Sequence, residues 1–262
     1  MLKAVLLRDR WVVAAALALM SLLGWWWLVR MNQHDVAMTG SVSMDMPMGD
    51  DAMPRSTASI MTTVGATFLM WFDMMVAMML PSAAPMILLY ERFAEQTRKA
   101  GGALLPTILF AGLYLAVWAA FSVVATVAQL YLAGIGLVDV ASLAFGDRRI
   151  AGALLIAAAL YQLTPAKRAC LDNCRSPLGF LRREWGPGWS SAVRLGLKHG
   201  AYCVGCCWLI MALLFVGGAM NLAWVAVLAL IVLVEKLAPA PDVARIAIAV
   251  GALLGGLYLL FR

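Results

Sequence analysis

The chain carries five cysteines in two clusters, and one of its two histidines stands beside the second cluster. On a helix, at about 100° per residue, the second cluster and its histidine fall within an arc of roughly 100°. The cysteines of the first cluster are four residues apart and also share a helix face. If the chain between the clusters folds back, their sulfur atoms can meet. The first cluster is Cys170 and Cys174, and the second is His199, Cys203, Cys206 and Cys207.

Clustered thiols beside an imidazole predict a soft-metal site. Thiolates select Cu(I), zinc or an iron–sulfur centre. Of these we expect copper, with zinc or iron as alternatives. The spacing lacks the paired Cys-x2-Cys modules of standard zinc sites. The composition indicates a membrane protein, and both clusters fall on its predicted cytoplasmic side. Structural disulfides are rare in that compartment. The alternative is that the cysteines are small apolar residues that pack between helices.

Methionine is concentrated in one region, because thirteen of the seventeen lie between Met31 and Met86. In the polar segment 31–60, several alternate with polar or turn residues near the other histidine. Thioethers are soft ligands and could collect Cu(I) on the oxidising side of a membrane. The alternative is a disordered loop with incidental methionines, although such loops are normally rich in Ser, Glu and Lys. The proposed ligands here are Met44, Met46, Met48 and His34.

A further group of thioethers lies in the apolar run 63–90, where Met70, Met74 and Met78 recur every four residues around Asp73. Methionine within a bundle is usually adaptable packing. An acidic residue within a membrane span is costly and usually faces the protein interior or a pathway. We therefore expect these four residues to line a metal route or site, with packing as the alternative.

One other acidic residue falls near the end of an apolar run. Glu235 adjoins Lys236 there. A local ion pair between these neighbours is the expected arrangement.

The composition is typical of an integral membrane protein. Hydrophobic residues make up 64% of the chain and charged residues 13%, whereas soluble domains average about 45–50% and roughly 25%. The apolar residues form long runs, and about 20 residues are needed to cross the hydrocarbon core. We predict an all-α, polytopic transmembrane bundle of about seven spans, of which the sixth could instead form a tight hairpin with the fifth. The predicted spans are residues 11–29, 63–90, 104–133, 150–163, 199–217, 222–234 and 244–261.

Positive charge gives this bundle an orientation. With seven spans, 15 Lys and Arg residues fall on one side and 5 on the other, so the N-terminus is predicted to be cytoplasmic. In a bacterial host this would be the inner (plasma) membrane. The charges lie between apolar runs, which argues against a nucleic-acid partner despite the net charge of +6. The predicted parts are an N-terminal anchor (1–30), a Met-rich extracytoplasmic loop (31–60) and a bundle (61–262) with a basic cytoplasmic segment (164–198).

Several stretches resemble a bacterial family of predicted metal-binding integral membrane proteins, a domain of unknown function. The resemblance covers about residues 61–250, and it implies a metal without naming one. The matching stretches are Met70–Pro81, Tyr161–Pro165 with Lys167, Cys170 and Cys174–Pro177, Gly200–Trp208, Met220–Asn221 and Glu235–Lys236.

Three classes of function remain open. The first is a membrane metal-handling protein that captures copper through outer thioethers, holds it through inner thiols, and has a metallochaperone or membrane enzyme as partner. The second is a membrane thiol–disulfide oxidoreductase, since Cys203 and Cys206 have Cys-x-x-Cys spacing. The third is a noncatalytic subunit or assembly factor of a membrane metalloenzyme. The sequence has no nucleotide-binding loop or zinc-protease signature, which disfavours an enzyme, and it leaves the oligomeric state open.

Overall fold

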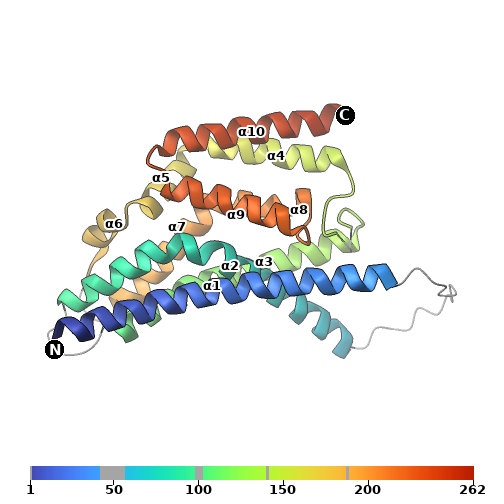
Figure 1. Cartoon of the computed structure of the whole chain (residues 1–262). Helices are drawn as coiled ribbons and strands as arrows, with labels where there is room; N and C mark the ends of the chain where they lie inside the picture. The colour runs from blue at the N-terminus through green and yellow to red at the C-terminus, as the bar shows by residue number, and fades with distance from the viewer. Residues whose placement is uncertain (1, 42–56, 98–102, 140–141, 187–188) are drawn as a thin grey trace.

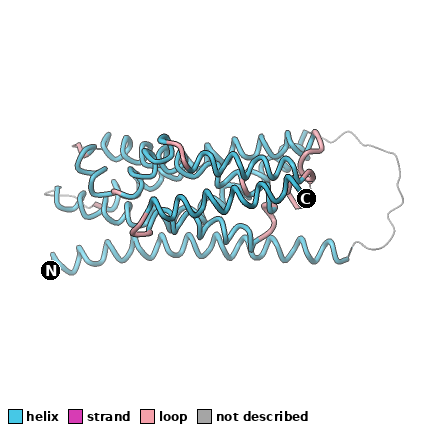
Figure 2. The backbone as a smooth tube through the Cα atoms, turned by 90° about the horizontal axis from the view of Figure 1, so that it is seen from above, coloured by secondary structure: helices cyan, strands magenta, loops and turns pink. Residues whose placement is uncertain are grey.

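The structure is a computed structural model, and it describes residues 2–41, 57–97, 103–139, 142–186 and 189–262. The all-α prediction is confirmed across these residues, where extended pairing is limited to a single bridge between Val138 and Phe145. The helices lie side by side in an elongated bundle (Figures 1 and 2). They are α1 (Leu2–Ser41), α2 (Thr57–Thr97), α3 (Leu104–Gly134), α4 (Arg148–Gln162), α5 (Pro165–Arg175), α6 (Pro177–Glu184), α7 (Trp189–Ala212), α8 (Leu214–Gly217), α9 (Leu222–Leu237) and α10 (Pro241–Phe261).

Five helical stretches in the described ranges are long and apolar enough to cross a membrane. They are Trp11–Gln33, Met61–Gln96, Leu104–Gly134, Trp189–Gly217 and Pro241–Phe261. The pair α4 and α5 would add a sixth, but it is bent by 67° at its break. The predicted sixth span corresponds to α9, whose 16 residues fall short of the roughly 20 needed to cross. A count of seven therefore requires α9 to cross as a short helix.

Some boundaries differ from those expected. The expected loop 31–60 has helix at both ends, because α1 runs to Ser41 and α2 begins at Thr57. The fifth predicted span starts earlier, since α7 begins at Trp189 instead of His199. The three cysteines of α7 consequently lie in the second half of a long helix and not near its first residue.

Prolines shape the middle of α2. The helix continues through Pro81 and Pro85, although a proline removes one backbone N–H and disturbs the preceding turn. The carbonyl four residues before Pro81 is that of Ala77, and Ser21 Oγ of α1 donates to it at 3.4 Å. In the same disturbed turn, the carbonyl of Met79 accepts from Tyr114 OH of α3 at 3.3 Å. Pro81 therefore frees the Ala77 carbonyl to bind a neighbouring helix.

Two glycines bring α7 close to α3. An added Cβ at Gly196 would stand 2.6 Å from the carbonyl oxygen of Phe110, and one at Gly200 would stand 2.9 Å from Val117. This four-residue spacing of small residues allows close approach of two helices in a membrane. It sets the cysteine-bearing half of α7 against the segment of α3 that carries Tyr114.

The chain turns sharply between α4 and α5 and folds back on α7. Thr164 caps α5, with its side chain accepting from the Lys167 N–H, and Pro165 occupies the first turn. Tyr161, just before the turn, donates from its hydroxyl to the carbonyl of Gly205 in α7. In Figure 1, α5 and α6 lie at the same end of the bundle as the N-terminus, and the C-terminus lies at the opposite end.

Candidate metal centre

The two cysteine clusters meet between α5 and α7. The Sγ atoms of Cys174 and Cys206 lie 4.0 Å apart. Two sulfurs that bind one ion at about 2.3 Å each can be at most about 4.6 Å apart. Cys206 is fully buried, and Cys174 is half-buried. The two sulfurs are therefore close enough to bind the same metal ion.

A thioether from α2 approaches the same stretch of α7. Cys207 Sγ lies 3.8 Å from Met79 Sδ, and both side chains are buried. The thiols of Cys206 and Cys207 also donate to the carbonyl of Cys203, at 3.1 and 2.8 Å. Of the two adjacent cysteines on α7, Cys206 thus faces a thiol of α5 and Cys207 faces a thioether of α2.

Cys203 lies in a more polar environment. Lys236 of α9 donates from Nζ to Cys203 Sγ at 2.9 Å and to Ser82 Oγ at 3.0 Å. Tyr114 OH lies 3.2 Å from the same sulfur. Cys203, Tyr114 and Lys236 are all buried, so an ammonium group stands within the protein interior beside the thiols.

The expected ion pair between Glu235 and Lys236 is wrong. Glu235 instead pairs with Lys167 of α5, with Nζ and Oε2 2.8 Å apart and both side chains almost fully buried. Neighbouring helical residues point to different faces, so Glu235 and Lys236 do not face each other. Arg175, next to Cys174, donates to the carbonyls of Glu235 and Ala238. These bonds fasten α5 to the end of α9 and hold Cys174 in place.

The structure places His199 among aromatic rings. Its ring centroid lies 5.5 Å from that of Tyr114, and 6.0 Å from those of Phe110 and Phe180. His199 is buried, and its Nδ1 has no hydrogen-bond partner in the described part of the chain. His199 shares a helix with the thiols, but its contacts are aromatic.

Cys170 occupies a different position from Cys174. Its Sγ lies against Gly205, where an added Cβ would stand 2.9 Å away. The absence of a side chain at Gly205 therefore allows α5 to approach α7. Cys170 packs into this contact.

The predicted row of methionines in α2 is buried, but the methionine paired with a cysteine lies next to that row. Met70, Met74 and Met78 belong to the core. The thioether in contact with a thiol is that of Met79. A signal for it existed in the sequence, since Met79 follows Met78 directly and lies one helical turn after Met75.

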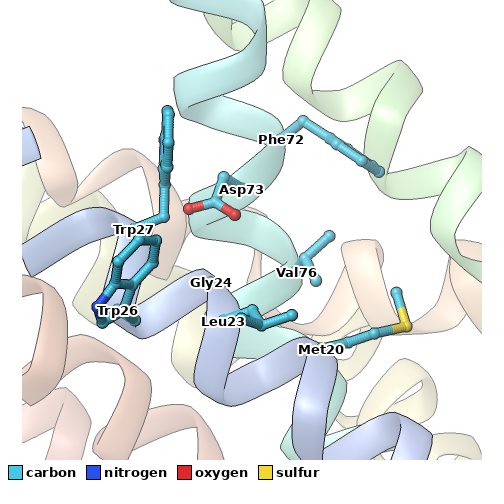
Figure 3. A pocket seen from close by; sticks show the side chains of 8 residues that line it. All are labelled: Met20, Leu23, Gly24, Trp26, Trp27, Phe72, Asp73 and Val76. Carbon is cyan, nitrogen blue, oxygen red and sulfur yellow. The ribbon is translucent and has the colours of Figure 1, made fainter. Parts of the chain in front are cut away.

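Asp73 lies apart from the thiols, between α1 and α2. It lines a cavity of about 440 Å³ together with Gly24, Trp26 and Trp27, and Figure 3 shows its carboxylate between the two helices beside Trp27. Its Oδ2 is buried without a hydrogen-bond partner in the described residues. The close contact between α1 and α2 depends on Gly24, where an added Cβ would be 3.0 Å from Ala77 Cβ.

The ligands that the sequence predicts on the outer side of the membrane are not among the side chains that the structure describes. Met44, Met46 and Met48 lie outside the described residues, and for His34 only the backbone, within α1, is described. Within the described ranges, no three His, Cys, Asp or Glu side chains are placed to hold one metal ion together. Two close sulfur pairs are present among these residues, and one of them includes a methionine. Such soft donors are chemically suited to Cu(I).

The fold and the sulfur contacts define a bundle of apolar helices with soft donors in its interior. Residues 68–259 match a family model described as PpoB2, copper chaperone. The chain belongs to this copper chaperone family. No curated protein and no solved structure matches the chain.

Proposed function

We propose that the protein is a membrane copper-handling protein that binds Cu(I) at the junction of α5, α7 and α2. The observation that carries the proposal is the 4.0 Å separation of Cys174 Sγ and Cys206 Sγ in a member of a copper chaperone family. Met79 and Cys207 provide a second pair of sulfur donors at 3.8 Å. Thiols and thioethers favour Cu(I) over harder ions.

The other ligands predicted from the sequence have lesser or earlier parts in copper binding. Cys203 links the two sulfur pairs, since it lies one helical turn before Cys206 and Cys207 on α7 and its carbonyl accepts from both of their thiols. Cys170 and His199 flank the two sulfur pairs and contribute less to binding. Met70, Met74 and Met78 with Asp73 form an approach along α2, and Met44, Met46, Met48 and His34 capture the ion first.

The orientation follows from charge. The N-terminus and the basic helices α5 and α6 lie at one end of the bundle, and the C-terminus lies at the other (Figure 1). Basic segments favour the cytoplasmic side. We propose that this end faces the cytoplasm of a bacterial cell and that the ion is passed to a metallochaperone or a membrane enzyme.

Anaerobic loading of the purified full-length protein with Cu(I) tests the proposal. We expect about one Cu(I) per chain after removal of loosely bound metal, and we expect its loss when Cys174, Cys206 and Cys207 are replaced by serine. Sub-stoichiometric copper that is unchanged in the serine variant would exclude the proposed site.

The same samples separate this function from thiol–disulfide exchange. A copper-binding site keeps all five thiols reduced and available for labelling after the metal is removed. An oxidoreductase would instead show one pair of thiols that is lost and regained over a narrow range of redox potential.

A further inference from the structure

Lys236 is a buried cation beside the sulfur cluster. Only 7% of its surface is exposed, and its Nζ lies 2.9 Å from Cys203 Sγ. Its other hydrogen bond goes to the neutral hydroxyl of Ser82 at 3.0 Å. Among the salt bridges of the described residues, none includes Lys236. The partner of this ammonium group is therefore the sulfur site itself.

The other charged groups at this end of α9 are stabilised by partners of their own. Glu235, its neighbour in sequence, forms a buried pair with Lys167 at 2.8 Å. Arg175 donates to backbone carbonyls at the C-terminal end of α9, where the helix dipole favours a cation. Lys236 thus contributes the charge that remains to be matched by the ligand site.

We infer that Lys236 is a specificity-determining residue that makes the sulfur cluster selective for a monovalent over a divalent metal ion. This inference rests on the proposed function. Two thiolates with Cu(I) carry one net negative charge, which the ammonium group of Lys236 neutralises. With a divalent ion such as Zn(II), the same group leaves one net positive charge in a buried site. Uncompensated charge is costly in such an environment.

The expected effect is large enough to measure. A unit charge about 6 Å from the ion, at an effective dielectric constant of about 20, changes a binding constant by roughly 100-fold. Removing the charge should weaken Cu(I) binding and leave Zn(II) binding nearly unchanged, because two thiolates with Zn(II) carry no net charge for the ammonium group to attract. A residue that only fastens α9 to α2 and α7 would instead weaken both ions together when it is removed.

The test measures Cu(I) and Zn(II) dissociation constants for the full-length protein in detergent, without oxygen, by competition with chromophoric chelators. For Lys236→Met we expect the preference for Cu(I) over Zn(II) to fall about 100-fold. Lys236→Arg, which retains the charge, should keep the preference of the wild type. Ser82→Asp places a carboxylate beside Nζ and should reduce the preference without removing the lysine, so it serves as the test if Lys236→Met does not fold.

Lys198→Met is the matched control. Lys198 also lies beside the site in sequence, on α7, but it is 41% exposed and pairs with Glu184 at 2.7 Å. Its removal should leave the preference unchanged. A preference in both Lys236→Met and Ser82→Asp within about threefold of the wild type, or an equal loss of both ions, would overturn the inference. If the wild type did not bind Cu(I), the proposed function itself would be wrong. If the wild type bound Cu(I) but its selectivity did not change in the Lys236 variants, only the inference about Lys236 would be wrong.

Discussion

The Sγ atoms of Cys174 and Cys206 lie 4.0 Å apart, although 32 residues separate them in the chain. Two features bring them together. The chain turns back after α4 at the Thr164 cap, and the missing side chain of Gly205 lets α5 settle on α7. The pair is thus a product of the helix arrangement, and replacing either thiol should disturb metal binding without disturbing the fold.

Cys206→Ser should weaken Cu(I) binding by at least about tenfold, because a hydroxyl is a poor ligand for a soft ion. Cys170→Ser is the matched control on α5, one helical turn before Cys174. Because Cys170 packs against Gly205 instead of pairing with a thiol, its replacement should change the dissociation constant less than threefold. Equal losses in the two variants would show that the pair at 4.0 Å has no special role.

Met79→Leu should reduce Cu(I) affinity while leaving the bundle intact. Leucine matches the volume of methionine, so a cost in stability below about 1.5 kcal/mol is expected, but the thioether beside Cys207 is lost. Met75→Leu makes the same change one turn earlier at an equally buried position. Affinity and thermal unfolding should be measured for both, and an affinity loss shared by the two variants would assign the effect to packing.

Gly196→Ala should destabilise the contact between α3 and α7. The new methyl group would stand 2.6 Å from the carbonyl of Phe110, and a backbone atom cannot move aside cheaply, so a loss of about 1–3 kcal/mol is expected. Gly112→Ala on α3 is the control, because its Cβ would meet nothing within 4 Å. Thermal unfolding in detergent should fall for the first variant and stay level or rise for the second.

Lys167→Met should be among the more damaging single changes, at about 3–5 kcal/mol, because it leaves Glu235 buried without its partner. Adding Glu235→Gln to the same chain should restore much of the lost stability. Unfolding of the single and double variants by heat or denaturant gives the comparison. If the double variant were as unstable as the single one, the cost would lie in packing and not in an unpaired charge.

Much of the architecture could be predicted from composition and helical spacing. The apolar runs anticipated the long helices, and the spacing of the cysteines on α7 predicted that they share a helix face. The meeting of the two clusters followed from one further assumption, a chain that folds back. The helices and the shared helix face depend on local sequence, which is why they could be predicted, whereas the folding back of the chain had to be assumed.

The partners of the thiols depended on helix packing instead. Met79 and not Met78 contacts Cys207, because the rotation of α2 relative to α7 selects one of two adjacent methionines. Lys236 turned towards Cys203 while Glu235 turned towards α5. No local pattern distinguishes such choices, since each is decided by helices distant in sequence.

X-ray absorption at the copper edge of the Cu(I)-loaded full-length protein tests the central claim most directly. We expect a shell of sulfur neighbours near the roughly 2.3 Å of a metal–thiolate bond, and we expect it to collapse in a variant with Cys174→Ser and Cys206→Ser. A shell made of nitrogen or oxygen neighbours, or a sulfur shell unchanged in that variant, would contradict a copper site between α5 and α7.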